Sequence, residues 1–179
     1  MNEVQTLTTI GQTDHIIMYY EMLKTKNNYY FVYEFCNGGT LMELLNKENH
    51  LEELKALDIF KQLLEAFKVL NRLNIMHRDL KPENIFFSDN KVKLGDFGFC
   101  KGLRPEENLT KTMLGSPIYM APEVLKGEAY STKADIWSLG VILYEMLYGV
   151  CPFQSSSIAM LINTINSHEI TLPSNIKVS

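Results

Sequence analysis

Three short motifs, following one another along the chain, constrain the fold more than any other feature of this sequence. They are the octet HRDLKPEN at residues 77–84, the triplet DFG at 96–98 and the triplet APE at 121–123. Each motif alone arises often by chance. In this order, with a hairpin pattern and a long loop between them, they form a highly specific combination that predicts a site assembled from separate segments.

Strand patterns occur near the start of the chain and again in its middle. Residues 16–21 and 29–35 are rich in aromatic and β-branched side chains, and a polar segment separates them, so they are predicted to form two paired strands. Short apolar runs at 85–87 and 92–94 flank a polar turn, which predicts a small hairpin.

Helical patterns dominate the remainder of the chain. Thr40 is expected to cap a short helix, and residues 52–73 carry apolar side chains at three- and four-residue steps, the period of an amphipathic helix. Residues 135–148 are apolar nearly all round, which predicts a buried helix, and residues 156–166 predict a last amphipathic one. Residues 99–118 lack a period and are expected to form a long functional loop. The predicted fold class is therefore α+β.

Composition excludes several other classes of protein. The 179 residues are 46% hydrophobic and 21% charged, as in folded proteins, and 17 basic against 21 acidic residues give no bulk charge for nucleic-acid binding. Three scattered cysteines argue against a disulfide framework or a cysteine zinc site and favour a cytoplasmic setting. We expect no signal peptide and no membrane span, because the most apolar stretch, residues 136–153, is short and interrupted by Glu145.

The residues inside the motifs suit the transfer of a phosphoryl group, which demands positioning of reactants and neutralisation of phosphate charge. Asp79 supplies a carboxylate that can accept the proton of an attacking hydroxyl, and Lys81 supplies a cation for the transferring phosphate. Asn84 and Asp96 offer the oxygen ligands that Mg²⁺ prefers beside substrate phosphates. The alternative is that Asp79 is a cap or surface carboxylate and Lys81 a solvated lysine.

With these motifs the chain resembles the eukaryotic protein kinases over nearly its whole length, from about Glu3 to Pro173. The resemblance implies a protein-kinase-like fold, with residues 1–36 a remnant of the small sheet lobe and residues 37–179 a large helical lobe without its last helices. It implies ATP and Mg²⁺ as cofactors and a protein substrate with a serine or threonine acceptor, because Lys81 is typical of the serine/threonine class. A regulatory protein partner is possible in this family.

The resemblance also implies where the nucleotide binds. The backbone of Glu34 and Cys36 is expected to contact the adenine edge, with Tyr33 deep behind it and Phe86 beneath the ring. Ordinary core packing of Tyr33 and Phe86, and a buried thiol at Cys36, is the alternative. Glu3 matches the glutamate of the family's small-lobe helix, although a glutamate near a chain end is more often simply solvated.

Further positions take their expected roles from the family as well. Thr112 stands three residues before Gly115, where a phosphorylated residue orders the loop, and Arg78 and Lys101 are expected to pair with that phosphate. An unmodified, solvated Thr112 is the alternative. His77 is expected to pack beneath Phe97 rather than act as a base, and Asp135 to accept backbone hydrogen bonds from the segment around His77 and Arg78. Acidic Glu83 and Glu145 could favour basic residues near the acceptor, but solvated acids are the simpler interpretation.

Two departures from the family pattern weigh against activity of this chain alone. None of its 10 glycines forms a G-x-G-x-x-G loop, and the lysine that would clamp the phosphates would have to precede Met1. We therefore expect an active serine/threonine kinase in a longer gene product, and weak ATP binding by these residues alone. A non-catalytic protein-binding module is the main alternative, and a small-molecule kinase a weaker one. Within the family, residues 96–101 and 115–120 look most like the Unc-51-like autophagy kinases, with calmodulin-dependent-type groups close behind.

Overall fold

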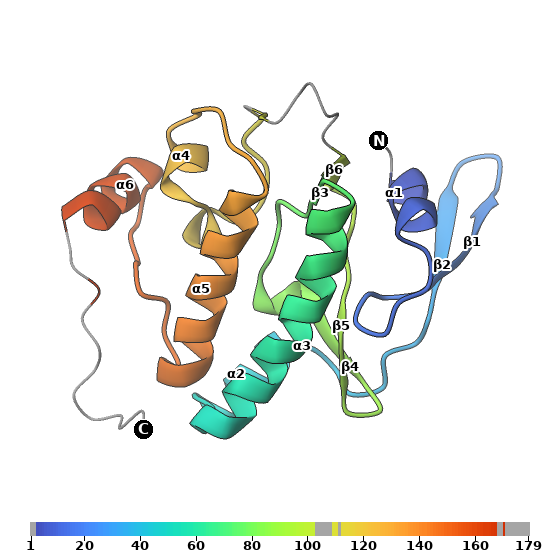
Figure 1. The fold of residues 1–179 in the computed structure, drawn as a ribbon, viewed down its shortest axis with the longest axis horizontal. Coiled ribbons are helices and arrows are strands. Elements are labelled where there is room, and N and C mark those ends of the chain that lie inside the picture. The colour runs from blue at the N-terminus through green and yellow to red at the C-terminus, as the bar shows by residue number, and fades with distance from the viewer. Residues whose placement is uncertain (1–2, 103–108, 111, 168–169, 171–179) are drawn as a thin grey trace.

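The computed structural model describes residues 3–102, 109–110, 112–167 and 170. It confirms the predicted α+β class (Figure 1). In chain order the elements are α1 Glu3–Ile10, β1 Tyr19–Lys24, β2 Tyr29–Tyr33, α2 Leu41–Glu48, α3 Glu53–Arg72, β3 Ile75–Met76, the 3-10 turn η1 Pro82–Asn84, β4 Ile85–Ser88, β5 Lys91–Leu94, β6 Lys101–Gly102, the 3-10 turn η2 Pro117–Tyr119, α4 Pro122–Leu125, α5 Lys133–Tyr148 and α6 Ile158–Ser167.

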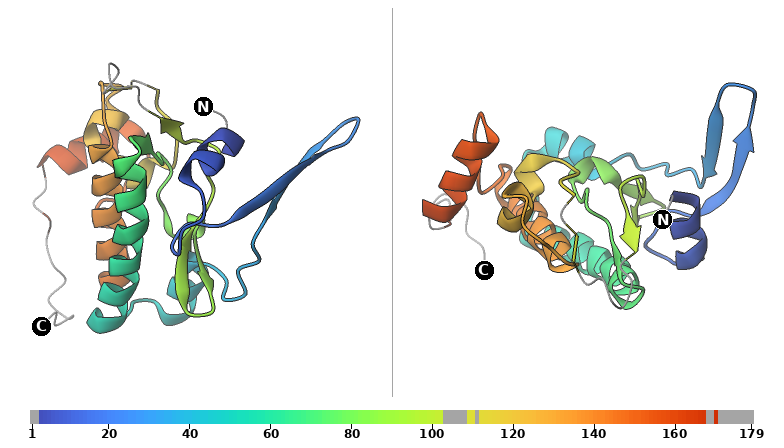
Figure 2. Two further views of the ribbon diagram at one scale, coloured as in Figure 1. Left: turned by 45° about the vertical axis from the view of Figure 1, so that its right-hand side comes forward. Right: turned by 90° about the horizontal axis from the view of Figure 1, so that it is seen from above.

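Helix α1 and the β1–β2 hairpin form one side of the molecule, and the helices with the β4–β5 hairpin form the other. In Figure 2 the β1–β2 hairpin extends as an arm away from the rest of the chain. Its strands pair antiparallel, from Tyr19 opposite Tyr33 to Lys24 opposite Tyr29, with an irregularity between Tyr19 and Glu21. The two regions meet where α1, the start of the arm and β5 come together.

The predicted boundaries of the first strand were wrong by three residues. The strand begins at Tyr19 instead of residue 16 and continues to Lys24. Ile16 and Ile17 leave the hairpin because they pair with Leu94 at the end of β5: Ile16 forms a parallel bridge with it, and the Ile17 N–H donates to its carbonyl over 2.9 Å. Ile16 is only 2% exposed, so burial against β5 outweighs continuation of the strand.

The first large-lobe helices follow their sequence signals closely. Thr40 caps α2 as predicted: its hydroxyl accepts from the Glu43 N–H and the Glu43 carboxylate accepts from the Thr40 N–H, a reciprocal capping box. Helix α3 matches the predicted range to within one residue at each end. Its buried face consists of Ala56, Ile59, Leu63, Ala66 and Leu70.

Helix α5 is the central support of the large lobe. Ile142 and Met146 are fully buried on it, and α3 packs alongside (Figure 1). The helix ends at Gly149, whose φ of 74° is the left-handed conformation that glycine adopts readily. Helix α6 begins two residues later than predicted. No helix among the described residues is long and apolar enough to cross a membrane.

The predicted middle hairpin is present as β4 and β5, which pair from Ile85 opposite Leu94 to Ser88 opposite Lys91. Asp89 and Asn90 turn the chain with φ values of 47° and 66°, as a two-residue hairpin turn of this hand requires. The predicted loop 99–118 contains two ordered anchors: β6 pairs with β3, and Thr110 bridges to Tyr130. The β4–β5 hairpin brings the end of the HRDLKPEN motif beside the start of the DFG motif, because the Gly95 N–H donates to the Asn84 carbonyl over 2.9 Å.

Candidate active site

A buried carboxylate on α5 holds the backbone of residues 77–79, the HRD segment. Asp135 is 2% exposed and accepts two hydrogen bonds, from the His77 N–H to Oδ2 over 2.8 Å and from the Arg78 N–H to Oδ1 over 3.0 Å. Burial raises the pKa of Asp135, while these two backbone hydrogen bonds oppose the rise. The predicted role of Asp135 as an acceptor for this backbone is confirmed.

His77 is a packing residue, as the sequence predicted. It is fully buried, and its ring meets the ring of Phe97 edge to face with centroids 5.1 Å apart. Nε2 donates to the Gly95 carbonyl over 2.9 Å, which leaves Nδ1 to accept from the Asp79 N–H over 3.4 Å. Burial lowers the pKa of His77, so the ring is held neutral and joins the two motifs.

The Asp79 carboxylate lies at the centre of the candidate site and is 3% exposed. The Lys81 ammonium lies 2.9 Å from Oδ2, and the Asn84 amide donates to the same oxygen over 3.1 Å and to the Asp79 carbonyl over 2.8 Å. Oδ1 accepts from the Ser116 N–H over 3.0 Å and lies 3.2 Å from the Ser116 hydroxyl. A carboxylate with this many donors is fixed in orientation, a condition for accepting a proton from a positioned hydroxyl.

Ser116 reaches Asp79 because the preceding residue is a glycine. Gly115 has a φ of 112°, and a Cβ atom added there would lie only 2.3 Å from the Arg78 carbonyl oxygen. Any side chain would force the two segments apart. Lys81 joins the same contact, since its ammonium lies 3.2 Å from the Ser116 hydroxyl.

Asn84 and Asp96 stand next to each other across the β4–β5 hairpin. The Gly95 N–H donates to the Asn84 carbonyl over 2.9 Å, and Asp96 follows with a φ of 58°. The Asn84 amide nitrogen is committed to Asp79, so the amide oxygen is the atom left for a cation. Among the described residues no three His, Cys, Asp or Glu side chains gather as a metal site. The donor set of one carboxylate and one amide suits Mg²⁺ that takes its other ligands from phosphates and water.

Helix α1 brings Glu3 to the DFG segment. The Tyr33 hydroxyl donates to Glu3 Oε1, and Glu3 Oε2 lies 3.9 Å from where a Cβ of Gly98 would stand. Burial raises the pKa of Tyr33, and the hydrogen bond to Glu3 and the charges of Glu3 and Asp96 raise it further. Glu3, Tyr33 and Asp96 therefore share one electrostatic environment, and Glu3 is not a solvated terminal residue.

The predicted nucleotide-binding residues lie where β2 enters the linker. The Glu34 side chain is occupied: Oε1 lies 2.8 Å from the Lys93 ammonium and accepts from the Met18 N–H over 2.7 Å. The Glu34 N–H donates to the Met18 carbonyl over 2.8 Å, which leaves the Glu34 carbonyl for a ligand. Cys36 is half-buried, and burial, followed by the charge of Glu34, raises the pKa of its thiol.

Phe86 connects this linker region with the DFG segment. Its half-buried ring packs so closely on Gly95 that a Cβ added there would lie 2.7 Å from Phe86 Cε2. Phe86 also bridges to Thr40 at the start of α2. Phe86 thus connects the start of α2 with the residue before Asp96.

The predicted phosphate-pairing residues line the loop after the DFG motif. Arg78 Nε donates to the Phe99 carbonyl over 2.6 Å, and the Lys101 ammonium lies 3.2 Å from the hydroxyl of Thr110, a 5% exposed residue. Thr112 is exposed, and its carbonyl accepts from the Tyr130 hydroxyl over 2.6 Å. Lys101 therefore contacts Thr110, and the Thr112 side chain faces solvent.

Sequence reasoning missed the contacts that complete the site. The motifs do not predict that Ser116 contacts Asp79, although it supplies two donors to that carboxylate. Lys93, the partner of Glu34, and Tyr130, the partner of Thr112, were not singled out. Only Ser116 carried a usable signal, since a glycine precedes it and a proline follows it.

Comparison with known proteins gives the same family throughout. The protein kinase domain model matches residues 1–178. The chain is 41% identical to serine/threonine-protein kinase atg1 of Dictyostelium discoideum, with 97% of this chain and 27% of that protein covered. It is 36% identical to serine/threonine-protein kinase ATG1a of Arabidopsis thaliana (97% and 28% covered), and 38% identical to the SNF1-related protein kinase catalytic subunit alpha KIN12 of the same plant (90% and 33% covered). The chain spans between 27% and 33% of the length of these relatives.

Proposed function

Because this chain belongs to the protein kinase family, we propose that the protein containing it transfers the γ-phosphate of ATP to serine or threonine hydroxyls of other proteins. One observation carries the proposal: Lys81, Asn84 and Ser116 converge through contacts of 2.9 to 3.2 Å on the single buried carboxylate of Asp79. Such a group is built to accept a proton at a defined point.

Asp79 is the proposed base. An acceptor hydroxyl placed at its carboxylate gives up its proton to Asp79 as its oxygen attacks the γ-phosphorus, and the bond from that phosphorus to the bridging oxygen breaks. Lys81 lies beside the same carboxylate, so its charge is available to the transferring phosphoryl group. Ser116 keeps Asp79 in orientation through Oδ1.

Asn84 and Asp96 are the proposed ligands of Mg²⁺, which supplies neutralisation of the charge on the ATP phosphates when bound. The Asn84 amide oxygen is left for this purpose because the Asn84 nitrogen donates to Asp79, and Asp96 Oδ1 accepts only from the neighbouring Gly98 N–H, over 3.4 Å, within the described part of the chain. The Glu34 carbonyl, the Cys36 backbone and the Phe86 ring are the proposed contacts of the adenine. Glu3 is the proposed small-lobe glutamate, standing beside Asp96 through Tyr33.

Thr112 is the proposed regulatory phosphosite. A phosphate on its exposed side chain would attract Arg78 and Lys101, which lie in the segments that the same loop contacts through Phe99 and Thr110. Arg78 would have to give up its bond to the Phe99 carbonyl, or share it, to reach the phosphate. The expected result of phosphorylation is a more ordered loop around Ser116.

A protein-binding role without catalysis is the second candidate, and one observation favours it: both oxygens of Asp79 already have partners, Ser116 at Oδ1 and Lys81 and Asn84 at Oδ2. The two candidates predict different responses to nucleotide. A kinase site binds Mg·ATP in a way that depends on Asp96, whereas a pure binding module does not respond to it.

The test measures transfer of labelled γ-phosphate to a substrate protein, and binding of Mg·ATP, with Asp79→Asn and Asp96→Asn variants of the same protein. We expect Asp79→Asn to reduce transfer by about a thousandfold or more while nucleotide binding remains. We expect Asp96→Asn to remove the dependence of nucleotide binding on Mg²⁺. Glu65→Gln, on the exposed surface of α3, is the matched control. Transfer that survives Asp79→Asn would disprove the assignment of the base.

A further inference from the structure

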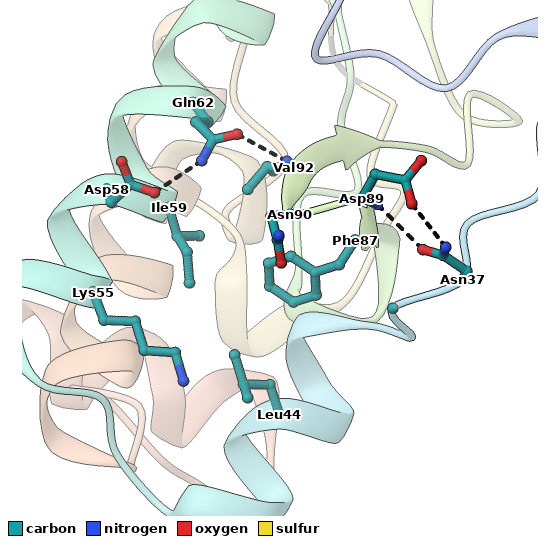
Figure 3. A pocket seen from close by; sticks show the side chains of 11 residues that line it. Asn37, Leu44, Lys55, Asp58, Ile59, Gln62, Phe87, Asp89, Asn90 and Val92 are labelled. Carbon is teal, nitrogen blue, oxygen red and sulfur yellow. Dashed lines mark hydrogen bonds between the residues drawn. The ribbon is translucent and has the colours of Figure 1, made fainter.

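Three segments meet at the Asp79 carboxylate, and contacts with the long helices hold two of them. Asp135 on α5 binds the backbone of the HRD segment. The β4–β5 hairpin is attached to α3, because the Val92 N–H donates to Gln62 Oε1 over 2.9 Å (Figure 3). The third segment, residues 112–116, reaches Asp79 through its last residue. A tyrosine outside the three motifs holds this third segment.

Tyr130 lies in the loop between α4 and α5 and contacts the chain at two neighbouring points. Its backbone forms an antiparallel bridge with Thr110, in which each N–H donates to the carbonyl of the other residue over 2.9 Å. Its hydroxyl donates to the Thr112 carbonyl over 2.6 Å. Because Tyr130 is only 3% exposed, packing fixes its ring and presents the hydroxyl in one place.

The hydroxyl of Tyr130 also lies beside the arginine of the HRD segment. Arg78, Tyr130 and Asp135 line one small cavity of about 20 Å³. Burial raises the pKa of Tyr130, while a hydrogen-bonding contact with Arg78 and the charge of Arg78 lower it. A phenol hydroxyl can donate one hydrogen bond and accept another, so this group is suited to connect the HRD segment with the loop.

The bond from Tyr130 uses the backbone of Thr112 and not its side chain. Thr112 is exposed, and its carbonyl accepts the bond whatever its hydroxyl carries. The neighbouring contact, from the Lys101 ammonium to the Thr110 hydroxyl over 3.2 Å, is likewise made without a phosphate. A phosphate on Thr112 would therefore be added to a loop that is already attached.

The attachment at Thr112 is close enough to act on the catalytic carboxylate. Only two residues separate Thr112 from Gly115, and Gly115 lies so close to the Arg78 carbonyl that a Cβ there would clash with it. Ser116 comes next and donates its N–H to Asp79 Oδ1 over 3.0 Å. Releasing the Thr112 carbonyl should therefore loosen the close approach at Gly115 and the hydrogen bond that follows it.

We propose that Tyr130 is a positioning residue for phosphoryl transfer: its hydroxyl fixes the Thr112 carbonyl and thereby keeps Ser116 on Asp79 before Thr112 is phosphorylated. The inference rests on the function proposed above, because the position of Ser116 affects transfer only where Asp79 is the base. It deepens that function by assigning the order of the loop to two successive devices. Tyr130 supplies basal order, and a phosphate on Thr112 adds to it through Arg78 and Lys101.

The first test measures amide hydrogen exchange at Ser116 in the full chain, treated with phosphatase. Tyr130→Phe removes one oxygen and keeps the ring, and we expect it to speed this exchange about fivefold to tenfold relative to amides of α5. Tyr148→Phe is the matched control, at an 8% exposed tyrosine at the end of α5, and should change it less than about twofold. Thr112→Ala should also leave it unchanged, because the carbonyl remains. Equal effects of the two tyrosine variants would overturn the proposal.

The native protein gives a check that does not depend on how a variant folds. Without phosphate on Thr112, the Ser116 amide should exchange at least about a hundredfold more slowly than in an unfolded peptide. An unprotected amide would show that the unmodified loop is not held on Asp79, and the proposal would be wrong.

The second test measures transfer of labelled γ-phosphate by the same variants, with kcat expressed per folded molecule. We expect Tyr130→Phe to lower kcat about fivefold in unphosphorylated protein and to leave the KM for ATP unchanged. Phosphate on Thr112, verified by mass spectrometry, should reduce this defect to less than about twofold, a rescue that a purely structural role would not show. A defect of equal size in both forms would contradict the proposal. Transfer lost in Asp79→Asn but unchanged in Tyr130→Phe rejects only the positioning role, whereas transfer that survives Asp79→Asn rejects the proposed base.

Discussion

The HRD segment and the β1–β2 hairpin contrast in how the fold treats their side chains. His77 and Asp79 are polar yet 0% and 3% exposed, and they bind residues as far along the chain as Ser116 and Asp135. The hairpin is rich in aromatic residues, yet Tyr20 and Tyr29 remain 57% and 58% exposed. The polar segment belongs to the interior, and the apolar one extends into solvent (Figure 2).

Burial in this molecule therefore follows long-range connection and not hydrophobicity alone. Each buried polar group of the HRD segment has a partner supplied by α5, the DFG segment or the loop around Ser116. The hairpin strands pair mainly with each other and have few neighbours to cover their faces. Four experiments test this contrast, from the largest expected effect to the smallest.

Removing the Asp135 carboxylate should have the largest effect on stability. Asp135→Ala leaves the buried N–H of His77 and the half-buried N–H of Arg78 without an acceptor, and we expect a loss of about 3 to 5 kcal/mol in the free energy of unfolding. Urea denaturation measures it. Asp135→Asn keeps one acceptor oxygen and should lose less. A change no larger than that of the exposed Glu65→Ala would contradict the role given to Asp135.

Placing a side chain at Gly115 should separate the Ser116 segment from the HRD segment. We expect Gly115→Ala to cost about 2 kcal/mol or more, because its Cβ would meet the Arg78 carbonyl and its φ is positive. Gly127 is the matched control: its φ is also positive, at 70°, but its surroundings are open, so Gly127→Ala should cost about 1 kcal/mol. Thermal unfolding compares the two. Equal costs would show that the close approach to Arg78 contributes nothing.

The burial of His77 should make stability depend on pH. Its pKa is lowered in the folded chain, so below about pH 6.5 the unfolded chain binds a proton that the folded chain does not, and stability falls as the pH falls. The slope from this residue is at most about 1.4 kcal/mol per pH unit. His77→Gln should remove that part of the slope, whereas His50→Gln, at an exposed position, should leave it. Denaturation between about pH 5 and 7 measures it.

Substitution in the hairpin should have the smallest effect. Tyr20→Thr and Tyr29→Thr replace exposed rings by another strand-forming residue, so we expect less than about 0.5 kcal/mol from each. Amide hydrogen exchange sharpens the comparison, because hairpin amides should exchange faster than those of His77 and Arg78. Slow exchange throughout the hairpin, or a loss of several kcal/mol from either substitution, would remove the contrast.

Local signals account for the parts of the fold that sequence analysis predicted well. Helix α3, the Thr40 cap and the β4–β5 turn depend on residues within a few positions of each other, and all three agree with prediction. The predicted start of the first strand was wrong because Ile16 pairs with Leu94, a residue far along the chain. The same limit applies to the site: its motif residues were named in advance, but the contact of Ser116 with Asp79 was not.

The sequence by itself determined which chemical groups this protein has and the order in which they occur, because motifs, caps and periodicity depend only on residues close together in the chain. Only the tertiary structure decided which groups meet. Asp79 is hydrogen-bonded by Ser116, which lies 37 residues further along the chain, and His77 is hydrogen-bonded to Asp135, 58 residues further along. Contacts over such distances depend on how whole elements pack, and burial then sets the charge state and orientation of each group.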